Sequence, residues 1–236
     1  MEKTKLSRFI SKYNLAGTVE SVKWTSGGNK LATNFISDDK SLLGSVSMTD
    51  FEYGDAEFGI FDTSRLVKMM SVLGTDVEFD VNKVNDKSVS MKFKDGSTSM
   101  TYMLSDLSVI TDAPALKNVP EFEAEIKLDM NTINSYIKGK SALAEEERFT
   151  FLCKGGKMQL VLGYSSINTN RITLDVEGTC SGDVDPIAFS ADYLKEILVA
   201  NKEAGEGVLK ISSQGLAHVQ FKVDEYVSDY YLVSRA

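Results

Sequence analysis

Apolar residues recur along the chain with two alternating periods, and the order of these periods predicts an α+β fold. Near the start, Leu6, Phe9, Ile10 and Tyr13 have the spacing of one helix face, which predicts a helix over residues 3–15. After it we expect strands at 18–24, 30–36, 42–48 and 56–61, a helix at 63–73, and strands around 77–81, 89–93 and 100–104. Antiparallel sheets covered by two helices are therefore expected in this half of the chain.

The second half of the chain repeats this order. Here we expect a strand at 122–128, a helix at 131–143, strands at 149–153, 158–162, 172–176 and 186–189, a helix at 191–200, and strands at 207–212, 217–223 and 228–234. The register repeats too, because Phe61 and Leu66 lie 128 positions before Phe189 and Leu194. We therefore predict two similar domains, residues 1–106 and 122–236.

Residues 107–121 join the two predicted domains. Pro114 and Pro120 lie in this stretch, and its apolar residues follow no clean period. This pattern is typical of an extended interdomain connector.

Composition limits the classes of protein that fit this pattern. A chain of 236 residues with 42% hydrophobic and 25% charged residues is typical of a soluble globular protein. It has neither a continuous apolar run of about 18 residues nor the apolar core of a signal peptide. We therefore expect an intracellular protein without membrane partners. Cys153 and Cys180 have no metal-site spacing and are expected to be reduced, packed thiols.

The sequence offers little to catalysis. His218 is the single histidine and lies in a predicted strand, so we interpret it as an ordinary strand residue. The glycine pairs 27–28 and 155–156 separate strands and predict hairpin turns, because a phosphate-binding loop needs a helix directly after its glycines. We therefore predict no enzyme, no catalytic residue, no cofactor and no metal.

Basic residues follow the predicted helices although the formal net charge is −8. Such acidity argues against binding nucleic acid through bulk electrostatics, so a DNA contact requires a local patch. The candidates for one weakly basic surface are Lys5, Arg8, Lys12, Arg65, Lys68, Lys138, Lys140, Lys195 and Lys202. The alternative is that these are the ordinary charges of solvated surface helices.

The order and length of the elements resemble the protomer of a DNA polymerase sliding clamp, with greatest similarity to the trimeric clamps of tailed phages. Residues 56–81 and 123–162 carry the resemblance. It implies two clamp domains per chain and a homotrimeric, six-domain ring that encircles duplex DNA without reading its sequence. It also implies a viral processivity factor in DNA replication, with a DNA polymerase and a clamp loader as partners in the cytoplasm of a bacterial host.

The resemblance also implies two contact sites. A pocket for partner peptides would use Val109, Ile110, Leu116, Tyr231 and Val233. The ring would close where Met100, Tyr102 and Leu104 of one protomer meet Ile172, Leu174 and Val176 of the next.

Two further kinds of protein are alternatives. A structural or assembly protein of a virus could also carry a duplicated α+β domain, but it would not raise polymerase processivity. A single-strand-binding protein would need exposed aromatic residues on a basic groove, whereas the aromatic residues here mostly occupy core positions.

Overall fold

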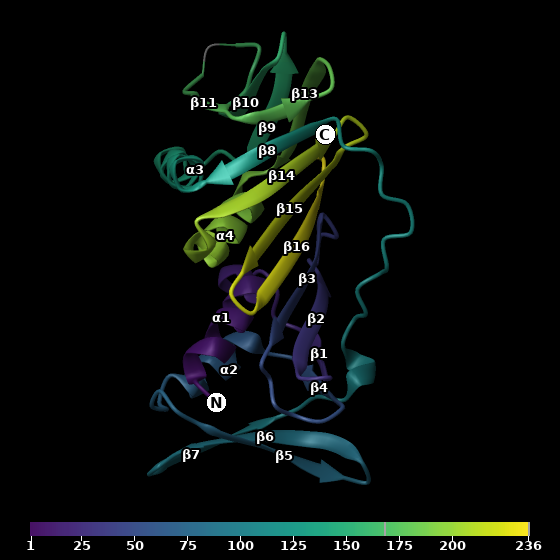
Figure 1. The fold of residues 1–236 in the computed structure, drawn as a ribbon, viewed down its shortest axis with the longest axis vertical. Coiled ribbons are helices and arrows are strands. Elements are labelled where there is room, and N and C mark those ends of the chain that lie inside the picture. The colour runs from purple at the N-terminus through teal and green to yellow at the C-terminus, as the bar shows by residue number, and fades with distance from the viewer. Residues whose placement is uncertain (168, 236) are drawn as a thin grey trace. The chain divides into compact units, whose positions relative to one another are not determined.

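The computed structural model describes residues 1–167 and 169–235, which divide into two compact units (Figure 1). Unit 1 comprises Met1–Asp38, Gly44–Pro114 and Asp224–Ser228. Unit 2 comprises Asp39–Leu43, Ala115–Val223 and Asp229–Ala236. No helix in the described part of the chain is both long and apolar enough to cross a membrane.

Unit 1 contains two helices and two antiparallel sheets. Its elements are α1 (Lys3–Asn14), β1 (Val22–Gly27), β2 (Lys30–Ile36), β3 (Leu42–Thr49), β4 (Ala56–Ile60), α2 (Thr63–Met70), β5 (Glu78–Val84), β6 (Lys87–Asp95) and β7 (Thr98–Met103). The strand order is β3-β2-β1-β4 in one sheet and β5-β6-β7 in the other.

Aromatic packing between α1 and the larger sheet forms the centre of unit 1. Phe9 and Tyr13 lie one helical turn apart on α1, and the Trp24 ring of β1 is 5.6 Å and 6.2 Å from theirs, edge to face in both cases. Leu6 and Ile10 complete the buried face of the helix. The spacing that predicts the helix is therefore the spacing of its core contacts.

Unit 2 repeats the arrangement of unit 1 with two additional strands, β8 and β12. Its elements are β8 (Ala124–Asp129), α3 (Met130–Ala142), β9 (Arg148–Lys154), β10 (Lys157–Leu162), β11 (Ile172–Val176), β12 (Gly178–Cys180), β13 (Val184–Ser190), α4 (Ala191–Asn201), β14 (Glu206–Ser212), β15 (Leu216–Val223) and β16 (Tyr226–Val233). The strand orders are β12-β8-β14-β15-β16 and β11-β10-β9-β13.

The helices of unit 2 begin at side-chain caps and pack against each other. Asp129 Oδ1 accepts a hydrogen bond from Thr132 N at 2.7 Å at the start of α3, and the Ser190 hydroxyl caps α4. Tyr136 of α3 lies edge to face with Phe149 of β9, which stacks on Phe189 of β13. These buried rings join α3 to the four-stranded sheet.

The predicted α+β class and the repeated order of elements are confirmed, and three local predictions were wrong. The strand predicted from residue 18 begins at Val22, because Leu15–Gly17 forms a 3-10 turn with Leu15 and Ala16 in left-handed conformations. The second helix ends at Met70, three residues early. Within the connector, Leu107–Val109 forms another 3-10 turn, and Ile110 after it is buried.

Candidate functional site

Two cations of α1 pair with the acidic turn between β15 and β16. Lys5 Nζ lies 3.7 Å from Glu225 Oε1, and Arg8 Nη2 lies 3.0 Å from Asp224 Oδ2. The side chains of Arg8 and Asp224 are both substantially exposed, so their pair stabilises the fold only modestly. Part of the positive charge of α1 is therefore offset within unit 1.

Lys12 does not lie on an exposed stripe, which corrects the prediction from its spacing. The side chain is fully buried, and its Nζ lies 5.2 Å from the centroid of the Tyr226 ring. Arg8 approaches the same ring, with Cζ 4.6 Å from the centroid. The Tyr226 hydroxyl donates to Lys5 O at 3.0 Å. Tyr226 therefore holds this face of α1 through cation–π contacts and a hydrogen bond.

Lys140 is also buried, contrary to the predicted exposed basic surface. Its Nζ donates to Ala144 O at 2.7 Å and lies 2.8 Å from Asp192 Oδ1 at the start of α4. Only 3% of Lys140 is exposed, because α3 packs against α4 at this point. Its ammonium group therefore links the end of α3 to the start of α4.

The remaining helix cations are accessible. Lys195 is half-buried and pairs with the adjacent Glu196 at 3.3 Å. Arg65 and Lys68 of α2, Lys138 of α3, and Lys202 directly after α4 are exposed, and the described residues provide no ion pair to these four. Of the predicted basic positions, two in each unit are therefore exposed and without an ion pair among the described residues.

Strand β7 lies at one edge of the three-stranded sheet of unit 1, and its predicted contact residues face inward. Met100 and Tyr102 are buried in their own unit, and the Tyr102 hydroxyl donates to Asp62 O at 3.0 Å. Leu104 follows the strand, and its N–H donates to Val89 O of β6. These apolar side chains therefore stabilise unit 1 itself. What remains accessible to a partner is the backbone along the outer edge of β7.

The direction of the β7 backbone groups follows from that last hydrogen bond. In an antiparallel ladder successive residues point their N–H groups to opposite sides. Because Leu104 N–H points to β6, the N–H groups of Tyr102 and Met100 do so as well. Those of Thr101 and Met103 point to the edge, where no strand pairs with β7 within the described residues.

Strand β11 forms a corresponding edge in unit 2. It pairs with β10 on one side only, in the register Ile172 with Leu162 and Val176 with Met158. Ile172, Leu174 and Val176 are half-buried. The strand therefore combines an open backbone edge with partly accessible apolar side chains.

The residues predicted to bind partner peptides fall in both units. In unit 1, Val109 is exposed and Ile110 is buried; in unit 2, Leu116 and Val233 are exposed. Each of the three exposed side chains is therefore accessible to a partner molecule on the surface of its own unit.

Tyr231, the fifth of these residues, lies in a polar and aromatic cluster of unit 2. Its ring stacks on that of His218, with centroids 4.4 Å apart and planes at 7°. The His218 Nε2 lies 2.9 Å from Asp229 Oδ1, which also accepts a hydrogen bond from Gln220 at 2.8 Å. Burial and, secondarily, Asp229 raise the pKa of the Tyr231 phenol above its usual value. His218 is therefore a strand residue with a satisfied contact.

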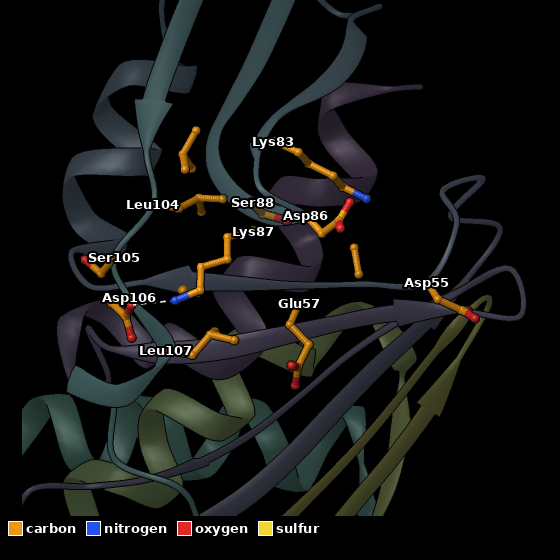
Figure 2. Close-up of a pocket in the computed structure, with 13 residues that line it drawn as sticks. Asp55, Glu57, Lys83, Asp86, Lys87, Ser88, Leu104, Ser105, Asp106 and Leu107 are labelled. Atoms are coloured by element: carbon orange, nitrogen blue, oxygen red, sulfur yellow. Dashed lines mark ion pairs between the residues drawn. The ribbon is translucent and has the colours of Figure 1, made fainter.

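A cavity of about 460 Å³ in unit 1 is lined by residues of both charges (Figure 2). Lys87 Nζ lies 3.8 Å from Asp106 Oδ2, and Asp55, Glu57 and Asp86 line the same space. Hydrogen bonding, chiefly from the Ser108 backbone N–H, lowers the pKa of Asp106 below its usual value. No group of metal-ligating side chains occurs among the described residues.

Comparison with solved structures relates this geometry to a known fold. No protein-family model matches the chain, and no curated protein sequence matches it significantly. Proliferating Cellular Nuclear Antigen (PCNA) from Entamoeba histolytica is 19% identical, with a TM-score of 0.75 over 100% of this chain and 96% of that one. The chain has the sliding-clamp fold.

Two further structures have the same fold over nearly the whole chain. In one, the C-terminal region of FEN-1 is bound to A. fulgidus PCNA; the match is 18% identical, with a TM-score of 0.76 over 98% of this chain and 96% of that one. The other is the PCNA2-PCNA3 complex from Sulfolobus tokodaii, which is 14% identical, with a TM-score of 0.75 over 100% of this chain and 98% of that one. The resemblance to sliding clamps is thereby confirmed at the level of the fold, and its phage branch stays a prediction.

Proposed function

We propose that this protein is a sliding clamp, a scaffold without catalysis that encircles duplex DNA and tethers a replicative DNA polymerase. The observation that carries the proposal is the likeness to PCNA over the entire chain, with a duplicated unit of two helices and antiparallel sheets. We also propose that residues 1–106 and 122–236 are the clamp domains and that 107–121 is their connector. Three copies would supply six such domains to one ring.

The subunit contact in this proposal is an antiparallel pairing of β7 with β11 of the next protomer. Both strands are edges with unpaired backbone groups in the described structure, and an open edge is a template for pairing with another chain. A head-to-tail contact of two different edges generates a ring when its rotation closes. The similar structure of a PCNA2-PCNA3 complex supports association between chains of this fold.

The DNA contact in this proposal is made by Arg65, Lys68, Lys138 and Lys202. Duplex DNA carries about one charge per 1.7 Å of its axis, so a few exposed cations can position it electrostatically. Contacts of this kind to phosphate carry no sequence information, which suits a protein that moves along DNA. Lys195 is a weaker candidate because of its pair with Glu196.

Partner proteins would bind through short peptides that contact Leu116 and Val233, two exposed apolar residues of unit 2, together with Tyr231 of the same unit. The bound C-terminal region of FEN-1 in one similar structure supports peptide recognition by this fold. An apolar surface that receives an extended segment is a common form of peptide recognition. DNA polymerase and clamp loader are the partners proposed for this site.

Ring formation is tested by sedimentation equilibrium with two variants of Thr101. Thr101→Pro removes an N–H from the open edge of β7 without removing a bond to β6, whereas Thr101→Val keeps that N–H. We expect the unmodified protein and Thr101→Val to form a trimer of the 26.0 kDa protomer, and Thr101→Pro to be monomeric with an unchanged circular dichroism spectrum. An unmodified protein that stays monomeric at every concentration would reject the ring.

The DNA contact is tested by duplex binding at several salt concentrations. We expect Arg65→Glu with Lys68→Glu to weaken binding and to flatten its salt dependence, because fewer counterions are released. The control is Lys30→Glu with Lys40→Glu, which changes the net charge equally at two exposed positions outside the helices. Equal losses in both double variants would show a general charge effect and contradict the assigned surface.

A further inference from the structure

The two cysteines lie 27 positions apart in the sequence, and the fold of unit 2 brings them together. Cys153 near the end of β9 is opposite Val184 of β13, and Cys180 ends β12 four positions before Val184. The Gly155 N–H donates to Asp183 Oδ1 at 2.8 Å, which holds the turn after Cys153 against the loop after Cys180. The backbone therefore brings together the segments that carry the two cysteines, which belong to different sheets of unit 2.

The side chains of the two cysteines are neighbours. Cys180 lies close enough to Cys153 to influence its thiol group, and the Cys180 thiol itself donates to Gly182 O at 3.0 Å. Both are free thiols. Cys153 is 1% exposed, whereas Cys180 is partly accessible to solvent. A small oxidant can therefore reach one sulfur of the pair, and the second sulfur adjoins the first.

We propose that Cys153 and Cys180 are a peroxide-sensitive thiol pair that closes to an intramolecular disulfide. In the first step the Cys180 sulfur attacks one oxygen of hydrogen peroxide, breaks the O–O bond and becomes a sulfenic acid, with release of water. In the second step the Cys153 sulfur attacks the Cys180 sulfur and displaces the hydroxyl group, which leaves as water with the Cys153 proton. Two thiols and one peroxide thus give one disulfide and two waters.

Solvent access and acidity set the order of the two steps. Burial and the neighbouring Cys180 raise the pKa of the Cys153 thiol to about 11, so this sulfur is rarely a thiolate in neutral solution. Cys180 is the more accessible sulfur and therefore meets peroxide first. The buried thiol then acts as the resolving group, because it needs only to reach a sulfur already beside it.

The disulfide would connect β9, which contains Cys153, to β12, which ends at Cys180. Cys153 lies opposite Met158, which lies opposite Val176 at the end of β11. Cys180 lies in β12, the short strand that follows β11. The disulfide would therefore fix the segment that leaves the β11 edge. Its formation does not depend on the proposed clamp function and is measured without DNA or a partner protein.

The test treats the purified, reduced full-length protein with hydrogen peroxide and follows thiol content, intact mass and peptide map. We expect both thiols to disappear, the intact mass to fall by two hydrogen atoms, and one peptide pair joining Cys153 to Cys180. A dithiol reductant should restore both thiols. Retention of both thiols after peroxide treatment, or a disulfide between two chains on a non-reducing gel, would overturn the proposal.

Single serine variants separate the two steps. In Cys153→Ser the resolving thiol is absent, so a sulfenic acid at Cys180 should accumulate and react with a dimedone probe. In Cys180→Ser the buried Cys153 should stay reduced under the same treatment, with circular dichroism checking that both variants are folded. Faster labelling of Cys153 in Cys180→Ser than of Cys180 in Cys153→Ser would contradict the assigned order, and equal inertness of both would contradict the pair.

Discussion

Two lysines on α3 provide a direct test of which helix cations support the fold and which face outward. Lys138 is exposed, whereas Lys140, two positions later, is buried and paired with Asp192. Replacing each with glutamate makes the same change of charge on the same helix. We expect Lys140→Glu to destabilise unit 2 and Lys138→Glu to weaken duplex binding with little effect on stability.

The magnitude of the Lys140 effect follows from its contacts. The substitution removes the 2.7 Å bond to Ala144 O and the 2.8 Å pair with Asp192, and it places a carboxylate in a site that is 3% exposed. Breaking a buried pair from one side costs about 3–5 kcal/mol, and the exposure of Asp192 favours the lower end. About 3 kcal/mol corresponds to a fall in melting temperature of roughly 6–12 °C for a chain of this length.

Thermal unfolding monitored by circular dichroism measures this difference. Lys138→Glu is near the end of α3 and opposes the helix dipole, which costs about 1 kcal/mol at most. Its melting temperature should therefore fall by no more than about 4 °C. The reasoning is refuted if Lys140→Glu unfolds at the same temperature as the unmodified protein, or if the two variants lose stability equally.

Three further substitutions have defined outcomes. Hydrogen bonding at the start of α3, chiefly from the Thr132 N–H, lowers the pKa of Asp129 below its ordinary value. The ionised carboxylate therefore stabilises the fold at neutral pH, and this contribution is lost as pH falls through the lowered pKa. Asp129→Asn should be less stable than the unmodified protein in urea at pH 7, and the difference in stability between the two should shrink in acid. Asp224→Asn removes one exposed negative charge from the turn beside α1, so duplex binding should strengthen slightly at low salt while stability changes by less than about 1 kcal/mol. A methyl group in Gly178→Ala would collide with the Glu125 carbonyl oxygen of β8, and denaturant unfolding should show a loss of about 1–3 kcal/mol.

Periodicity was sufficient to predict the α+β fold because core packing and periodicity are the same property in regular elements. Leu6, Phe9, Ile10 and Tyr13 are all buried at the spacing that predicts α1. The short strand β12 was missed because three residues, one of them a glycine, are too few to show alternation. Turns with left-handed residues other than glycine, such as Leu15 and Ala16, carry no sequence signal of this kind.

The candidate site was predicted less well, because charge type does not reveal burial. Lys12 and Lys140 have helix spacings consistent with a basic stripe, yet each contacts an element distant in sequence, Tyr226 for one and Asp192 for the other. An extended strand places alternate side chains on opposite faces, so Met100 and Tyr102 could have been placed with the buried residues of β7. The proximity of Cys153 and Cys180 has no local signal in the sequence, since it depends on how two sheets of unit 2 are arranged.

An acidic protein can act on DNA if retention and affinity have separate physical origins. At a net charge of −8, this chain as a whole repels duplex DNA, and the exposed cations of its helices oppose that repulsion locally. In a closed ring, escape would require opening a subunit contact, so the proposed strand pairing of β7 with β11 would set retention. The proposal therefore predicts opposite effects for two sets of variants. Thr101→Pro should abolish retention on circular DNA although the helix cations are unchanged. Arg65→Glu with Lys68→Glu should leave the trimer intact. If retention followed the cations and ignored the β7 edge, enclosure would not be the mechanism.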